Sequence, residues 1–152
     1  MTATAVREAR PEDLPRLAAI RAASLRETPP QLLEVAVRGV GLVLVATDPA
    51  TGTDPAAEGV PVGYGLAMRD GEGEVAYLAE LAVAPGHRRR GHGSALLSAF
   101  LDRLSDHEML RLTTRADDDR ARAFYESAGF DPVRTLPDHY ADGDGVLYER
   151  KL

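Results

Sequence analysis

A short loop rich in glycine and arginine holds the residues best suited to binding a phosphate group. Residues 88–93 (RRRGHG) follow an apolar run typical of a strand and precede a run with helical periodicity. The start of a helix offers unpaired backbone N–H groups and a positive dipole end, which favour an anion. Gly91 and Gly93 let a phosphate approach the backbone closely. Three side chains add positive charge, those of Arg88, Arg89 and Arg90. The pattern indicates a phosphate-binding loop, with a solvated arginine run as the alternative.

The loop matches neither common nucleotide-binding motif. A Walker loop requires Gly-Lys-Ser/Thr, and the dinucleotide fingerprint requires G-x-G-x-x-G; neither string occurs at residues 88–93. The chain has no cysteine, and its 4 histidines do not pair in an H-x-x-x-H pattern. They are His87, His92, His107 and His139. We therefore expect no metal site, no disulfide framework and no cysteine nucleophile.

Length, charge and composition restrict the class of protein. A chain of 152 residues is the usual size of one domain, so we expect a single domain over residues 1–152. The net charge of −6 and the aromatic content of 5% disfavour a nucleic-acid partner. No apolar run reaches the length of a membrane span, and the first residues lack the apolar core of a secretory signal. We expect a cytoplasmic protein without a membrane partner; a homodimer is compatible with the sequence.

The elements that must position the loop alternate between strands and helices. We expect strands at residues 4–9, 41–47, 62–69, 74–83, 110–114, 130–134 and 146–151. We expect helices from residue 11 and at residues 31–38, 94–104 and 118–127, with long loops at residues 48–61 and 137–145. The strand, helix and strand between residues 74 and 114 imply a parallel crossover. The order β-α-α-β-β-β-α-β-α-β-β predicts an α/β (α+β) fold with one mixed central sheet flanked by helices.

Two segments resemble the signatures of the GNAT superfamily of N-acetyltransferases. Residues 78–104 (LAELAVAPGHRRRGHGSALLSAFLDRL) resemble its acetyl-CoA-binding segment, in which a strand ending L-x-V-x-P precedes [QR]-x-x-G-x-[GA] and a helix. Residues 121–130 (ARAFYESAGF) resemble its second signature, A-x-x-F-Y-x-x-x-G-F. The element order also fits the GNAT fold. The resemblance is strong over residues 78–130 and rests on element order alone before them.

The resemblance implies acetyl-CoA as the co-substrate. Backbone amides of the loop are expected to hold the pyrophosphate, and the strand backbone at Leu81 and Val83 to pair with the pantetheine arm. This pairing requires the strand to separate from its parallel neighbour at residues 110–114. In the family an Asn often stands seven residues before the helix Tyr, where this chain has Asp118. The implied cofactor-binding residues are Leu81, Val83, Arg88, Arg89, Arg90, Gly91, His92, Gly93, Ser94, Asp118 and Tyr125.

The resemblance also suggests an acid and a base for acetyl transfer. Tyr125 matches the family tyrosine that protonates the departing thiolate, with simple core packing as the alternative. Glu80 is a charged residue within an apolar strand, where burial is costly unless the group is used. We treat Glu80 as a candidate base, with a surface or acceptor-side carboxylate as the alternative. Strand alternation places Glu80 and Leu81 on opposite faces, and a bulge would shift this count.

The C-terminal residues suggest how an acceptor could bind. Residues 138–152 resemble the tail of the protein N-terminal acetyltransferase branch, with the pair His139-Tyr140 in place of two tyrosines. A hairpin loop with an ordinary packed tyrosine is the alternative. We expect Glu80, Asp138 and Tyr140 to contact the acceptor. The acceptor is expected to enter opposite the cofactor, between residues 28–31 and 136–144.

The sequence leaves two functions in competition. The first is transfer of acetyl from acetyl-CoA to an amine: a protein N-terminus, a lysine or a small amine. Four carboxylates favour a cationic acceptor, those of Glu80, Asp138, Asp142 and Asp144. The second is a non-catalytic acyl-CoA-binding or regulatory module on the same fold.

Overall fold

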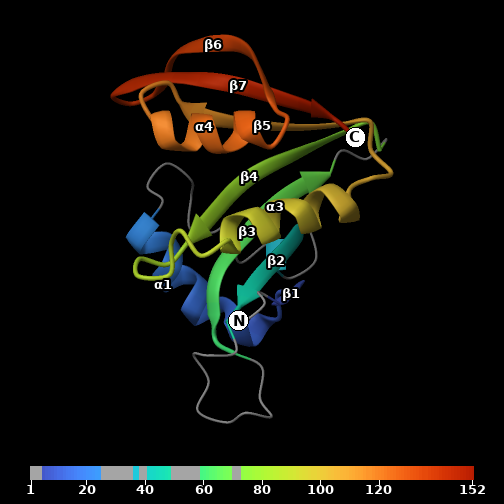
Figure 1. Ribbon diagram of the computed structural model, residues 1–152, viewed down its shortest axis with the longest axis vertical. Helices are drawn as coiled ribbons and strands as arrows, with labels where there is room; N and C mark the ends of the chain where they lie inside the picture. Colours follow the sequence, from blue (N-terminus) through green and yellow to red (C-terminus); the bar gives the residue numbers. More distant parts are fainter. Residues whose placement is uncertain (1–4, 25–35, 38–40, 49–58, 70–72) are drawn as a thin grey trace.

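The described residues form one seven-stranded sheet with helices on both faces (Figure 1). The computed structural model describes residues 5–24, 36–37, 41–48, 59–69 and 73–152. The strands, in the sheet order β1-β2-β3-β4-β5-β7-β6, are β1 Ala5–Glu8, β2 Leu42–Thr47, β3 Pro61–Arg69, β4 Val75–Val83, β5 Met109–Arg115, β7 Gly143–Lys151 and β6 Asp131–Tyr140. Neighbours are antiparallel except for β4 and β5, which are parallel. The predicted mixed sheet and its crossover are confirmed.

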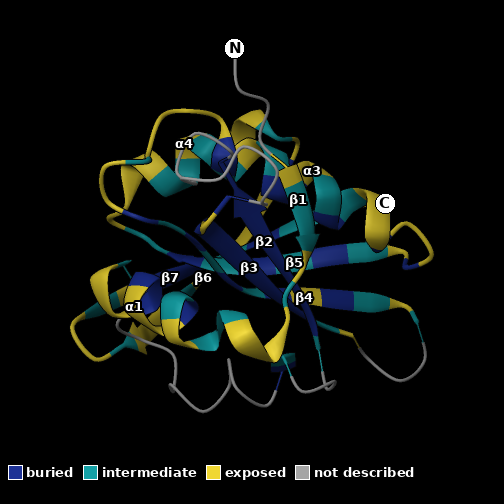
Figure 2. Ribbon diagram, turned by 90° about the horizontal axis from the view of Figure 1, so that it is seen from below, coloured by how far each residue is buried: buried dark blue, intermediate teal, exposed yellow. Residues whose placement is uncertain are grey.

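Two hydrophobic clusters attach the helices to opposite faces of the sheet. The 3-10 turn Pro11–Asp13 leads into α1, Leu14–Ser24, which buries Leu17 and Ile20 in one cluster. The helices α3, His92–Arg103, and α4, Asp119–Ser127, pack on the other cluster. The central strands β2 and β3 are buried along nearly their whole length (Figure 2), which explains their continuous apolar sequences. Within the described ranges, every helix is too short or too polar to cross a membrane.

The C-terminal part of the chain differs from its prediction. We expected a loop at residues 137–145, but β6 and β7 form one long hairpin that turns between Tyr140 and Gly143. Pro132 and Pro137 are accommodated because β6 is an edge strand, paired only with β7. The pairing of β6 with β7 is interrupted by two register shifts, and Asp138 has a positive φ of 53°. The predicted helix at residues 31–38 and the loop at residues 48–61 lie mostly outside the described residues.

A β-bulge in β4 decides which way its side chains point. Leu66 pairs with Glu80, and Ala67 pairs with Leu78, so Ala79 is the extra residue. Before the bulge Leu78 packs on the cluster beneath α3, and after it Leu81 does so. Glu80 is thereby turned toward the opposite face, which α1 covers.

Candidate active site

The strands β4 and β5 begin side by side and then separate (Figure 1). Their parallel pairing runs from Val75 and Met109 only to Tyr77 and Arg111, although β4 continues to Val83. The backbone of β4 beyond Tyr77 is therefore unpaired on the side that faces β5. The predicted separation of the two strands is confirmed. It leaves N–H and C=O groups available to a ligand with amide bonds of its own.

Two clefts open on the separated strands and meet near α4. The larger has a volume of about 570 Å³ and extends over the loop that contains residues 87–93. The smaller has a volume of about 300 Å³ and lies between β4, β5 and the end of β6. Five residues line both: Ser24, Leu81, Asp118, Ala121 and Tyr125. A molecule in one cleft would therefore meet a molecule in the other at these side chains.

The larger cleft contains the start of α3. Gly91 precedes the helix with a φ of 86°, a conformation that glycine adopts without strain. The first helical backbone bond joins the N–H of Ala95 to the carbonyl of Gly91 at 3.0 Å. The preceding amides of the first turn therefore lack an intrahelical partner, as a phosphate site requires. Ten of the eleven predicted cofactor-binding residues line this cleft; the exception is Arg90.

The side chain of Arg88 holds the end of β4 in place. Its Nε donates to the Val83 carbonyl at 3.1 Å, and its Nη2 donates to Ser24 Oγ at 3.1 Å. Arg88 thus joins the end of α1 to the strand. Arg89 and Arg90 are exposed at the loop surface.

A buried carboxylate forms part of the smaller cleft. The side chain of Glu80 is fully buried, and its Oε1 accepts a hydrogen bond of 2.5 Å from the Tyr64 hydroxyl. The guanidinium of Arg21 lies 3.6 Å from the same oxygen and balances its charge. Burial and the neighbouring carboxylate raise the pKa of Tyr64 well above its usual range, so Tyr64 stays a donor. Glu80 Oε2 has no hydrogen-bond partner within the described part of the chain.

The hairpin of β6 and β7 supplies the outer wall of the smaller cleft. Tyr140 lines this cleft, and the guanidinium carbon of Arg115 lies 5.1 Å from the centre of its ring. Arg115 also pairs with Asp142 at 2.9 Å and with Asp117 at 3.2 Å. Asp138 is absent from the described lining of both clefts; its backbone N–H donates to Asp144 Oδ1 at 2.9 Å.

Comparison with known proteins places this geometry in a family. Residues 36–130 match the sequence profile described as the acetyltransferase (GNAT) family. The chain belongs to the GNAT family. The predicted family is therefore confirmed, and the clefts stand where its signature segments meet.

Individual relatives cover this GNAT chain to different extents. A mycothiol acetyltransferase of Kineococcus radiotolerans is 41% identical over 80 residues, which are 52% of this chain and 26% of that protein. The [ribosomal protein bS18]-alanine N-acetyltransferase of Escherichia coli K12 is 38% identical over 72 residues, 46% of this chain and 49% of that protein. The chain thus spans a quarter to a half of the length of these relatives. The structure of Ard1 from Thermoplasma volcanium is 29% identical with a TM-score of 0.83, and covers 99% of this chain and 98% of that one.

Tyr125 stands at the junction of the two clefts of this GNAT domain. It lies on the face of α4 that packs on the sheet. Its ring meets those of Phe124 and Phe130 edge to face, and the ring centres are 5.1 and 5.7 Å from that of Tyr125. Burial, reinforced by the charge of Asp118, raises the pKa of Tyr125 above its usual range. The hydroxyl is therefore protonated at neutral pH and available as a donor.

Asp118 has a structural role that the sequence did not reveal. Its Oδ1 accepts the Ala121 backbone N–H at 3.0 Å and so caps α4. The residue also lines both clefts, where its second oxygen can only accept a hydrogen bond.

Several residues of the site escaped the sequence analysis. Ser24 ends α1 at the junction of the clefts, whereas Arg21 and Tyr64 enclose Glu80 from α1 and β3. No local motif marks them, because each reaches the site only through the packing of distant elements. His92, although it lines the larger cleft, is almost fully buried. Residues 28–31, the other predicted border of the acceptor entrance, lie outside the described residues.

Proposed function

We propose that this protein transfers the acetyl group of acetyl-CoA to an amine. The observation that carries the proposal is the position of Tyr125 where two clefts meet between the separated strands. The larger cleft suits the cofactor, and the smaller suits the acceptor. Membership of the GNAT family supports the same reaction.

The residues of the larger cleft fit acetyl-CoA. Unpaired amides at the start of α3 and the exposed Arg89 suit a pyrophosphate. The edge of β4 from Leu78 to Ala82, which does not pair with β5, suits an arm with amide groups, because an extended ligand can add to a free strand edge. The next carbonyl, that of Val83, is already bonded to Arg88. Acetyl-CoA supplies the thioester that the acceptor attacks.

Tyr125 and Glu80 divide the proton transfers between them. A cationic amine first releases one proton to solvent. The neutral amine then forms a C–N bond to the thioester carbonyl carbon, and the C–S bond breaks. Glu80 is proposed to take the proton from the amine through bridging water, because its Oε2, which has no hydrogen-bond partner within the described residues, is buried out of direct reach of the acceptor. Tyr125 is proposed to donate its proton to the departing sulfur, since its raised pKa keeps the hydroxyl protonated. The hydrogen bond from Tyr64 fixes the orientation of the Glu80 carboxylate.

A cationic amine, such as the N-terminus of a peptide, is the acceptor class that we propose. Tyr140 in the smaller cleft offers a flat amphipathic surface, and Glu80 lines the same cleft with its charge offset by Arg21. The similarity to an alanine N-acetyltransferase and to Ard1 supports a peptide acceptor. Asp142 is engaged with Arg115, so it contributes less than the sequence analysis expected.

The test is release of free CoA against a panel of amines. Peptides with a free N-terminus, the same peptides with a blocked N-terminus and an internal lysine, and small amines are compared, with mass spectrometry of the product. We expect acetylation of free N-termini with one CoA released per acetyl group transferred. Binding of acetyl-CoA without turnover on any amine would favour the non-catalytic acyl-CoA-binding module instead.

A further inference from the structure

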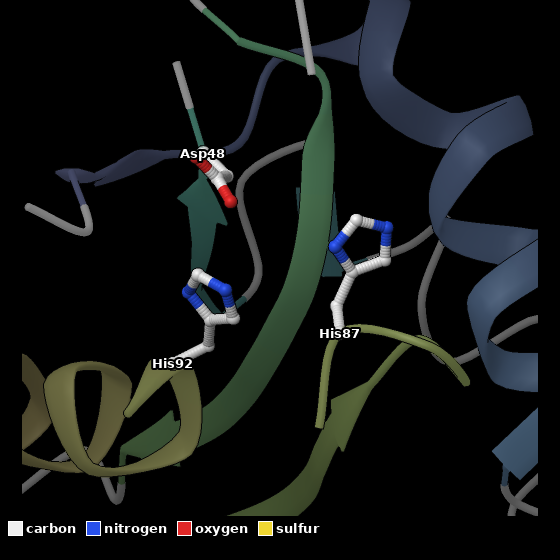
Figure 3. Close-up of side chains that lie close together, drawn as sticks. All are labelled: Asp48, His87 and His92. Carbon is white, nitrogen blue, oxygen red and sulfur yellow. The ribbon is translucent and has the colours of Figure 1, made fainter. Parts of the chain in front are cut away.

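Three potential metal ligands from distant parts of the sequence converge behind the phosphate loop (Figure 3). Asp48 follows β2, His87 lies in the loop after β4, and His92 is the first residue of α3. One donor atom from each of the three lies within 4.8 Å of the others. The sequence analysis expected no metal site, because it compared only spacings along the chain.

The three side chains are withdrawn from solvent. Asp48 is 6% exposed and His92 is 4% exposed. His87 is half-buried, and its Nδ1 is inaccessible and has no hydrogen-bond partner within the described ranges. A buried imidazole nitrogen without a partner is unfavourable. A ligand that accepts its lone pair would remove this cost.

The donor set suits a particular class of cation. Zinc binds imidazole nitrogen and carboxylate oxygen at roughly 2.0–2.2 Å, often through three protein ligands and one open position. Tetrahedral donors at that radius lie roughly 3.3–3.6 Å apart, so donor atoms that now lie within 4.8 Å of one another must move closer to close on an ion. Magnesium and calcium prefer oxygen ligands, whereas two of these three donors are nitrogens.

We propose that Asp48, His87 and His92 form a binding site for a divalent transition-metal ion such as Zn²⁺. The proposal is independent of the proposed acetyl transfer. The ion would join both ends of the loop at residues 87–92 to the end of β2. The positive charge of nearby Arg90 opposes a cation, and the carboxylate of Asp48 offsets it. His87 and His92 also line the larger cleft, so the bound ion would stiffen the wall of the cofactor site.

The test is calorimetric titration of the full chain with ZnCl₂ after treatment with EDTA and dialysis. We expect one ion per chain, with no binding of Mg²⁺ under the same conditions. The variants His87→Gln and His92→Gln are expected to weaken binding at least about tenfold, because loss of even an outer-shell partner costs roughly 10–100-fold. His139→Gln is the matched control, since His139 is exposed on the edge strand, and it should bind as the parent does.

Thermal unfolding gives a second measurement on the same proteins. Zn²⁺ should raise the Tm of the parent and of His139→Gln, because a ligand that binds only the folded state stabilises it. It should raise the Tm of His87→Gln by less, because this variant binds the ion more weakly. His87→Gln alters a half-buried loop side chain and keeps the test valid if His92→Gln does not fold. Absence of binding, or equal binding by the parent and His87→Gln, would overturn the proposal.

Discussion

At the scale of single residues, removing the hydroxyl of Tyr125 distinguishes a catalytic role of this side chain from a packing role. Tyr125→Phe keeps the ring contacts with Phe124 and Phe130 and removes only the proposed acid. We expect kcat to fall about 10²–10⁴-fold, the usual contribution of a general acid. Acetyl-CoA affinity, measured by calorimetry, should stay near that of the parent. An unchanged kcat with chemistry rate-limiting would assign Tyr125 to packing.

The raised pKa of Tyr125 has a consequence for the pH profile. A general acid must be protonated, so activity is lost as pH rises through its pKa. Burial moves that pKa upward from the ordinary value of 10.0. The alkaline loss of kcat due to Tyr125 should therefore begin only above pH 10. A fall in the kcat of the parent below that pH that is absent in Tyr125→Phe would contradict this assignment.

A substitution of Glu80 can show whether the buried carboxylate moves a proton or only stabilises the fold. Glu80→Gln preserves the shape of the side chain and an oxygen that can accept from Tyr64. We expect kcat to fall about 10²–10⁴-fold, the usual contribution of a general base. Glu108→Gln is the matched control, because Glu108 is exposed and outside the described lining of both clefts. Reduced stability of Glu80→Gln with an unchanged kcat would leave Glu80 a structural role.

At the scale of elements, two glycines at the start of α3 serve different purposes. Gly91 has a φ of 86°, and a Cβ added to it would meet no atom within 4 Å. Gly91→Ala should therefore destabilise through backbone strain alone, by about 1–2 kcal/mol in chemical denaturation. A Cβ on Gly93 would contact Phe124 at 3.7 Å, an ordinary distance.

Gly93→Ala should consequently fold as stably as the parent and bind acetyl-CoA more weakly. Its backbone is helical, where alanine is favoured over glycine. The new methyl group would instead obstruct the close approach of the pyrophosphate. Unfolding and calorimetric titration of both variants distinguish the two roles. Unchanged acetyl-CoA affinity in Gly93→Ala would place the pyrophosphate elsewhere.

The sequence predicted those elements whose signals are local. The apolar spacing of α3 and the glycines of its loop lie within one short segment, and both were found at the correct place. The bulge at Ala79 left no local mark, although it decides that Glu80 faces α1. The strand of residues 137–140 was missed because its proline and glycine-rich surroundings favour a loop, and pairing with β7 prevails.

At the scale of the whole molecule, packing brings together residues that no spacing rule connects. Asp48 and His92 are 44 positions apart, yet they meet behind the loop because β2 ends beside the start of α3. Tyr64 and Glu80 meet because β3 and β4 are paired neighbours. Sequence motifs therefore marked the loop and helix that line the larger cleft, whereas the lining of the smaller cleft depended on the tertiary fold.

The same arrangement predicts that the two substrates can be affected separately. Tyr140 lines only the smaller cleft, where it packs beside Arg115 at 5.1 Å, and Arg120 lines only the larger. Tyr140→Ala should raise KM for the acceptor about fivefold, corresponding to the loss of about 1 kcal/mol of contact, and leave KM for acetyl-CoA unchanged. Arg120→Ala is the reciprocal control and should raise KM for acetyl-CoA alone. Steady-state kinetics with each substrate varied in turn measures both effects. If both variants impaired both substrates equally, the clefts would act as one site, and the division between cofactor and acceptor would be wrong.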